Sequence, residues 1–345
     1  MSGSRYLLRR LMLSVLVILG VLLVTFMVSR VIPGDPARLY VGTRASEEAL
    51  AEVRQQLGLD DPLPQQFVRY VWSSARGDFG YSYRTKRPIL EDLKVRLPAT
   101  MELVTVAMIL AIGIGIPTGV LAAADYGGKF DRFIRVLSIA GVSMPAFWLA
   151  LLLQLVFFLW LGWLPLGGRL SQSIFFTAPI TSITGFGLID SLVTGNWIAF
   201  RDSVWHIVLP AAVLATFPVG LVVRMMRASM LEVLSETYVA AARAAGLSET
   251  QILFKFALKN AIVPTLTVMG LVFAFSITGA VLVETIFLWP GVGSYMLEAI
   301  LNNDVPVLFA VTLIVTMIYI LVNFLVDVLQ ATLDPRIRVG QREEA

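Results

Sequence analysis

Six stretches of the chain contain no Asp, Glu, Lys or Arg; they cover residues 11–29, 103–124, 136–168, 203–223, 260–283 and 305–326. An α-helix needs about 20 mainly apolar residues to cross a hydrocarbon layer about 30 Å thick. The sequence therefore predicts an all-α membrane protein with six transmembrane helices. The third stretch is longer than a span requires, and Pro145 and Pro165 predict that only its middle part, to about residue 163, is straight.

The composition agrees with a membrane protein and excludes several classes of site. Hydrophobic residues make up 57% of the chain and charged residues 15%, against about 45–50% and about 25% in soluble proteins. The chain has no cysteine and one histidine, which excludes a disulfide scaffold, thiol catalysis and a multi-histidine metal centre. A formal net charge of +3 gives no indication of nucleic acid binding.

A seventh uncharged stretch, residues 171–189, is not predicted to span. It contains several Ser, Thr and Gln residues, Pro179 and two glycines, so it is too polar for a helix that faces lipid. Counting it as a span would also move the basic segment 224–259 to the outside, against the rule that Lys and Arg of short loops stay cytoplasmic.

The positions of the basic residues predict that both termini are cytoplasmic. With six spans, the cytoplasmic segments contain Arg5, Arg9, Arg10, Lys129, Arg132, Arg135, Arg224, Arg227, Arg243, Lys255, Lys259, Arg336, Arg338 and Arg342. The short external segments contain only Arg169 and Arg201, and the long segment 33–98 is expected outside regardless of its charge. The first uncharged stretch exceeds the usual signal-peptide length of about 7–15 apolar residues, which predicts a retained helix.

The external segment after the first helix is predicted to be folded. Ser46 and the glutamates that follow it begin an amphipathic helix that runs to about Leu57, and Gly58 occupies its stop position. Prolines and the glycines of residues 77–80 predict turns in the remainder of this segment. We expect a cap on the outer membrane face or a surface that contacts a partner.

Ionisable side chains are nearly absent from the predicted spans. Glu284, Asn323 and Asp327 lie near the ends of the fifth and sixth spans, where they have either a structural role or line a path or gate. Glu102 has the same two interpretations, and His206 is expected to be an interfacial residue with a local partner rather than a ligand.

This scarcity argues against several activities. Ion-coupled transporters normally use intramembrane carboxylates or broken helices around a midplane site, and no predicted span has a carboxylate at its centre. No span offers a nucleophile with a base, and no Gly-x-x-x-x-Gly-Lys-Ser/Thr loop is present to bind phosphates. If the chain moves a solute uphill, another chain must supply the energy.

The loop between the fourth and fifth spans has the clearest local signals. Residues 236–245 predict a short helix with its acidic residue at the N-terminal end, and Gly246 follows at the stop position. Ser248 with Gln251 predicts a capping box for the next helix, flanked by the apolar pair Leu247 and Ile252. The helix surface is mostly alanine, which buries little area in a membrane and favours docking in a protein cleft over lying on lipid headgroups.

Ala240-Ala241-Ala242 followed by Gly246 resembles the cytoplasmic "EAA" loop of ABC importer permeases, and 238–264 resembles its dipeptide/oligopeptide branch. Ala240 replaces the Glu of the general motif, and Lys259 stands where many families have Pro, which concerns the branch more than membership. Further similar stretches are Ile32-Pro33-Gly34-Asp35-Pro36, Leu57-Gly58-Leu59-Asp60, Gly77-Asp78-Phe79-Gly80, Arg96-Leu97-Pro98-Ala99-Thr100, Ser143-Met144-Pro145, Glu284-Thr285-Ile286-Phe287, Trp289-Pro290-Gly291 and Asp334-Pro335-Arg336-Ile337-Arg338.

The resemblance implies a type I ABC importer permease fold and a set of partners. It implies a heterodimer with a homologous second permease, two cytoplasmic ABC ATPase subunits that use ATP and Mg, an external solute-binding protein, and the plasma or inner membrane of a bacterium or archaeon. This chain would itself bind no cofactor or metal and have no catalytic residue. The implied coupling helix that contacts the ATPase comprises Glu236, Tyr238, Ala240, Ala241, Ala242, Arg243, Ala244, Ala245, Gly246, Leu247 and Ser248.

The predicted domains are residues 1–32 with the first helix, an external segment 33–98, a permease core 99–332 with the coupling loop 224–262, and a cytoplasmic tail 333–345. Di- or oligopeptides are the expected substrates. Alternatives are another small solute, such as a nickel chelate, glutathione or an oligosaccharide, on the same scaffold. A secondary transporter or channel that acts alone, or a passive assembly subunit, are interpretations from other classes.

Overall fold

The computed structural model describes residues 3–31, 37–38 and 46–333, and within these ranges all regular elements are helices. A single isolated bridge joins Tyr81 and Pro88. The described residues form two compact units, one of Arg96–Ser294 with residues 321–333, the other of the described residues up to Val95 with Tyr295–Ile320. The motifs at 32–36 and 334–338 and the tail lie outside the described residues.

Four of the six predicted spans coincide with long apolar helices. Four helices of the described residues are long and apolar enough to cross a membrane: α5 (Ile89–Ala124), α10 (Trp197–Leu234), the continuous helix Glu249–Ile286, and α15 (Val305–Leu333) over Val305–Leu329. A bent pair of helices gives a fifth candidate. α1 (Gly3–Val31) contains the shorter apolar stretch Met12–Val28, which matches the first predicted span.

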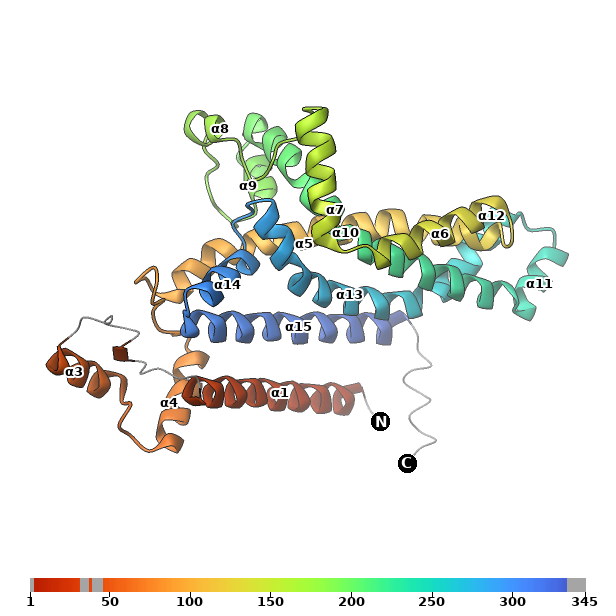
Figure 1. Ribbon diagram of the computed structural model, residues 1–345. Helices are drawn as coiled ribbons and strands as arrows, with labels where there is room; N and C mark the ends of the chain where they lie inside the picture. Colours follow the sequence, from red (N-terminus) through yellow and green to blue (C-terminus); the bar gives the residue numbers. More distant parts are fainter. Residues whose placement is uncertain (1–2, 32–36, 39–45, 334–345) are drawn as a thin grey trace. The chain divides into compact units, whose positions relative to one another are not determined.

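The third uncharged stretch is interrupted at Pro145, one of the two prolines expected to limit its straight part. α6 (Lys129–Ser143) and the helix formed by α7 (Ala146–Leu153) and the π-helix η1 (Gln154–Trp160) meet at 103°. Met144 is extended, because the ring of Pro145 disfavours helical backbone in the residue before it. Figure 1 shows α7 turning away from the line of α6 at this point.

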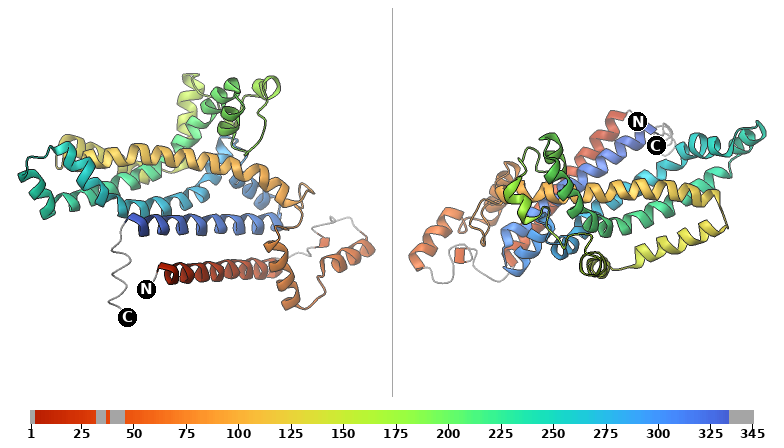
Figure 2. Two further views of the ribbon diagram at one scale, coloured as in Figure 1. Left: turned by 180° about the vertical axis from the view of Figure 1, so that it is seen from behind. Right: turned by 90° about the horizontal axis from the view of Figure 1, so that it is seen from above.

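Close helix packing organises the first unit. α10 packs most extensively on α13 (Leu258–Ile286) and also along α6, and Figure 2 shows these helices side by side with α5. Gly115 and Gly119 let α5 approach α10 closely: a Cβ atom at Gly119 would lie 2.8 Å from the Cβ of Met226. Small residues four apart are a common means of close approach between membrane helices.

The stretch 171–189 forms no spanning helix, as the sequence predicted. It contains α8 (Gln172–Thr177), a loop and the start of α9 (Gly187–Val193). The buried carboxylate of Asp190 accepts hydrogen bonds from the backbone N–H groups of Ile183, Thr184 and Gly185 and from the Thr184 hydroxyl. One side chain thus fixes the loop before α9.

The second unit contains the predicted external helix and two further helices. α3 (Glu47–Leu57) is capped by Ser46 and ends at Gly58, whose φ of 58° is left-handed, as the stop signal predicted. α4 (Leu63–Ala75) packs on α1, with the Thr25 and Tyr70 hydroxyls 3.2 Å apart. The predicted domain boundary at residue 98 falls inside α5, which begins at Ile89 and continues through Pro98.

Candidate functional site

The loop between α10 and α13 forms the helix, turn and helix that the sequence predicted. α11 (Thr237–Ala244) begins after Glu236, whose backbone is extended, and it lies at the opposite end of the first unit from α8 and α9 (Figures 1 and 2). Gly246 has a φ of 80° and donates its N–H to the Arg243 carbonyl, while Leu247 donates to Ala242. These two bonds are the Schellman pattern that closes a helix at a left-handed glycine.

The second helix begins with the predicted capping box. In α12 (Glu249–Gln251) the Ser248 hydroxyl accepts from the Gln251 N–H, and the Gln251 side chain accepts from the Ser248 N–H. A π-helical segment η2 (Ile252–Ala257) then leads into α13. The sequence did not indicate that this segment is π-helical rather than α-helical.

α11 is held to the chain by one face and leaves the other exposed. Val239 is fully buried and Ala242 is half-buried. The exposed residues of the helix and its cap are Thr237, Tyr238, Ala240, Ala241, Arg243, Ala244 and Ala245. The surface formed by Ala240, Ala241, Ala244 and Ala245, which we call the alanine face, has no side chain larger than a methyl group. A partner helix or groove can approach the α11 backbone closely there.

Polar contacts fix the orientation of α11 relative to the next helix. The Arg243 guanidinium makes two bonds to the Glu249 carboxylate, from Nε to Oε1 at 2.8 Å and from Nη2 to Oε2 at 3.2 Å. This contact raises the pKa of Arg243 above its ordinary value. The Asn260 amide donates to the Tyr238 hydroxyl at 2.7 Å. Both contacts connect α11 to residues that follow the glycine turn, Glu249 of α12 and Asn260 of α13.

An apolar cluster connects this loop to three long helices. Its buried members are Val120 and Ala123 of α5, Met226 and Met230 of α10, and Ala257 and Ala261 at the start of α13. Leu234, two residues before Glu236, and Leu253 of η2 pack against the cluster. Leu234 and Leu253 thus join the two ends of the loop to the same closely packed core.

An ion pair at the same end of the first unit was not predicted from the sequence. The fully buried Asp131 of α6 accepts from Nε and Nη2 of Arg227 of α10 at 2.5 and 2.8 Å, and it also accepts from the Gly127 N–H. The partners are 96 residues apart, and no local pattern pairs them. The bidentate geometry fixes α6 against α10.

The side chains proposed to line a path have different environments. Glu284 is fully buried and accepts from the Thr100 hydroxyl at 2.5 Å and the Ser294 N–H at 2.9 Å. Asn323 and Asp327 are half-buried on α15. Their role in a path stays a prediction, but in this structure the Glu284 carboxylate is enclosed by groups of its own chain.

Glu102 and His206 have structural partners. The buried Glu102 carboxylate pairs with Arg169 at 2.5 Å and accepts from the Leu188 N–H at 2.7 Å. His206 is buried, with Nδ1 2.8 Å from the Asp202 carbonyl oxygen, as expected for a histidine with a local partner. In the described part of the chain, no group of three or more His, Cys, Asp or Glu side chains is placed to hold a metal ion.

Comparison with known families assigns the chain to a family. The family described as "Binding-protein-dependent transport system inner membrane component" matches residues 115–339. The chain belongs to this family. The related N-terminal description, "Binding-prot-dependent transport system membrane comp, N-term", matches residues 3–104. The two matches together include α1, α3, α4 and all the long apolar helices except residues 105–114 of α5.

Curated relatives match nearly the whole length of this permease. It is 46% identical over 95% of its length, and 96% of the relative's, to the "Probable D,D-dipeptide transport system permease protein DdpB" of Escherichia coli K12. It is 42% identical to the "Dipeptide transport system permease protein DppB" of Alkalihalophilus pseudofirmus, over 96% of this chain and 99% of the relative. The DppB protein of Escherichia coli K12 is 42% identical to this chain, over 97% of this chain and 98% of the relative.

A solved structure shares the fold of this permease. A chain of the MetNI methionine ABC transporter, in a structure titled for its inward facing conformations, matches with a TM-score of 0.53. The match covers 70% of this chain and 96% of that chain at 16% sequence identity. The likeness agrees with the importer fold that the sequence resemblance implies.

Proposed function

We propose that this permease forms, with a homologous second permease, the membrane path of an ATP-driven importer for di- or oligopeptides. The observation that carries the proposal is the exposed alanine face of α11. The helix ends at a left-handed glycine, and the segments on either side of its loop pack against the ends of α5, α10 and α13 through Leu234 and Leu253. The family membership and relatives named as dipeptide permeases support the substrate class.

In this proposal α11 is the coupling helix. Each of two ABC ATPase subunits uses ATP and Mg, and one of them receives the alanine face in a groove. Closure of the ATPases moves α11, and the apolar cluster behind it tilts α10 and α13 between inward and outward openings. An external solute-binding protein delivers the peptide, and this chain contributes neither catalytic residue, cofactor nor metal ligand.

The proposed topology has six spans with both termini in the cytoplasm of a bacterial cell. It counts α1, α5, the bent pair of α6 and α7, α10, α13 and α15 as spans, and the bacterial relatives and the family description support the inner membrane. α11 and Asp131 then lie on the cytoplasmic side and α8 and α9 on the outside. The proposed domains are the N-terminus with the first helix (1–32), the external segment (33–98), the permease core (99–332) with the coupling loop (224–262), and the cytoplasmic tail (333–345).

The deciding experiment is uptake by the reconstituted complex. The two permeases and two ATPases are placed in liposomes with the binding protein outside and ATP with Mg inside, and entry of a radiolabelled dipeptide is measured. We expect uptake that requires both ATP and the binding protein. A nickel chelate, glutathione or an oligosaccharide accumulated in place of the dipeptide would assign the alternative substrate class. Uptake driven by an ion gradient without ATP would refute the proposal.

A further inference from the structure

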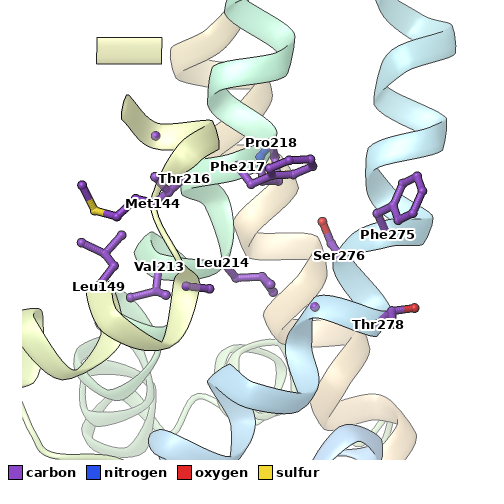
Figure 3. A pocket seen from close by; sticks show the side chains of 13 residues that line it. Met144, Leu149, Val213, Leu214, Thr216, Phe217, Pro218, Phe275, Ser276 and Thr278 are labelled. Atoms are coloured by element: carbon purple, nitrogen blue, oxygen red, sulfur yellow. The ribbon is translucent and has the colours of Figure 1, made fainter. Parts of the chain in front are cut away.

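A cavity of about 370 Å³ lies at the break between α6 and α7, where these helices meet α10 and α13. Figure 3 shows its lining, which includes Met144 beside the break, Leu214 and Thr216 of α10, and Ser276 of α13. All four elements belong to the first unit and to candidate spans. Among the described residues that line the cavity, none carries a charge.

Two backbone carbonyl groups at the cavity lack their helical donors. A proline has no N–H, so the carbonyl four residues before it receives no helical hydrogen bond. Pro218 inside α10 leaves the Leu214 carbonyl without this donor, and Pro145 does the same for Gly141. Both Leu214 and Gly141 line the cavity. At membrane depth, irregular backbone is tolerated where it is buried in protein or lines a water-filled cavity.

The hydroxyl groups at the cavity add acceptors of the same kind. Thr216 donates its proton to the Ala212 carbonyl at 3.0 Å, and Ser276 donates to Val272 at 2.8 Å. Each hydroxyl has one proton and two lone pairs, so both oxygens are left as acceptors. In Figure 3 the Ser276 hydroxyl lies on the side of α13 that faces α10, whereas the Thr278 hydroxyl points away from α10.

Hydrogen-bond donors come from the other side of the break. α7 begins at Ala146, which lines the cavity, and Pro145 before it provides no side-chain cap. The first N–H groups of a helix have no partner within the helix. The cavity therefore has acceptors on α10, on α13 and at Gly141 of α6, donors at the start of α7, and apolar walls between them.

We infer that this cavity binds the main chain of a transported peptide, with its amino-terminal residue against α10 and α13 and its following carbonyl toward the start of α7. The inference rests on the proposed peptide importer and names the site at which that substrate is held during passage. An uncharged site with backbone-type donors and acceptors recognises the group that all peptides share. It therefore accepts different side chains that its volume can hold.

The test uses two dipeptide probes with a photoreactive diazirine leucine in the first or the second position. Each probe is delivered by the binding protein to the complete transporter in liposomes and irradiated, and labelled residues are identified by mass spectrometry. We expect the first probe to label 213–217 and 275–279, and the second probe to label 141–149. The same labels from both probes, or labels elsewhere, would overturn the inference.

Variants separate binding in the cavity from other effects. Gly279→Leu fills the cavity, and a Cβ atom there meets only Leu214 Cδ1 at 3.9 Å. Its matched control is Gly113→Leu on α5, where nothing lies within 4 Å of a Cβ atom. We expect Gly279→Leu to reduce labelling and dipeptide uptake by about tenfold or more, the size of losing one or two net hydrogen bonds together with volume, and Gly113→Leu to leave both unchanged.

Two further variants and the wild-type uptake measurement give separate outcomes. Thr216→Val with Ser276→Ala removes two acceptors while keeping the volume, and it should reduce labelling by the first probe about three- to tenfold; unchanged labelling would overturn the inference. A cysteine at Gly279 that crosslinks to the second permease with and without peptide would identify the cavity as a packing surface. Wild-type complex without ATP-driven dipeptide uptake would refute the proposed function itself.

Discussion

The hydroxyl of Thr100 donates a 2.5 Å hydrogen bond to the carboxylate of Glu284 and at the same time accepts the N–H of Val292 at 2.7 Å. One threonine on α5 thereby joins the end of α13 to the start of α14 (Val292–Leu301). Gly293 permits this arrangement, because a Cβ atom there would lie 2.9 Å from Glu284 Oε2. The carboxylate that the sequence offered as a path residue is here the centre of a buried polar network.

Thr100→Val should destabilise the permease through this network. It keeps the side-chain volume but removes a donor from the buried Glu284 and an acceptor from Val292, and an unsatisfied buried polar group costs about 1–3 kcal/mol. Thermal unfolding of the purified complex measures the loss. The matched control is Thr118→Val, also on α5, whose hydroxyl donates only to carbonyls of its own helix. Equal unfolding temperatures of both variants would contradict the role of Thr100.

The loop before α9 should open only in acid. Burial raises the pKa of Asp190, but the hydrogen bonds from the Thr184 side chain and from the backbone N–H groups of Thr184, Ile183 and Gly185 outweigh it, so the folded-state pKa lies below its ordinary value. A depressed carboxyl pKa gives stability that is present above the unfolded pKa of about 3.9 and is lost as the pH falls through the folded value. Amide exchange at Gly185 should stay protected at neutral pH.

Asp190→Asn provides the comparison for this prediction. The amide oxygen still accepts hydrogen bonds, but the charge and its titration are gone. We expect protection at Gly185 to be weaker than in wild type at pH 7 and nearly independent of pH down to pH 4, after correction for intrinsic exchange. Wild-type protection that declines between pH 7 and pH 5 would show that another group controls the loop.

The sequence predicted the features of the fold that depend on residues close together in the chain. The Ser248 capping box and the left-handed Gly246 follow from residues a few positions apart, so their geometry was readable. Pro145 was expected to limit the straight part of its stretch, but the sharp bend there was not readable, since Pro98, Pro117, Pro210 and Pro218 lie inside continuous helices. Whether a proline bends a helix depends on neighbouring helices. The pairing of Asp131 with Arg227 likewise depends on distant chain segments.

A large side chain on the alanine face of α11 should prevent docking to the ATPase. Ala244→Trp places a large ring on the exposed face and should abolish binding-protein-stimulated ATP hydrolysis while the permease still inserts. Ala242 is a poorer position for this test, because it is half-buried. Ala51→Trp, at an exposed alanine of α3, is the control and should retain stimulation. Normal stimulation in Ala244→Trp would show that this face does not dock.

Introduced cysteines test the topology without background, because the chain has none of its own. Ser173→Cys and Asn302→Cys, both at exposed positions, should react with an impermeant maleimide in intact cells. Lys129→Cys and Thr250→Cys, also exposed, should react only after permeabilisation. Ser191 is unsuitable because its side chain is fully buried. Reaction at position 250 in intact cells would contradict the six-span topology.

Gly246 should tolerate asparagine but not valine. A Cβ atom at Gly246 meets nothing within 4 Å, so any effect of a substitution there arises from the backbone conformation and not from lack of space. A β-branched residue held at a φ of 80° is strained by roughly 1–2 kcal/mol, whereas asparagine adopts left-handed backbone more readily. The chain relieves the strain in Gly246→Val by extending α11 through the turn, which breaks the bonds from Gly246 to Arg243 and from Leu247 to Ala242.

The extended helix would point the alanine face away from its present direction while every span stays intact. We therefore expect Gly246→Val to assemble normally and to lose most of the stimulation of ATP hydrolysis by the loaded binding protein, together with peptide uptake. Gly246→Asn should retain both. The measurement is ATP hydrolysis by the reconstituted complex with and without loaded binding protein. If valine and asparagine have the same effect, the left-handed turn is not what aims α11 at the ATPase.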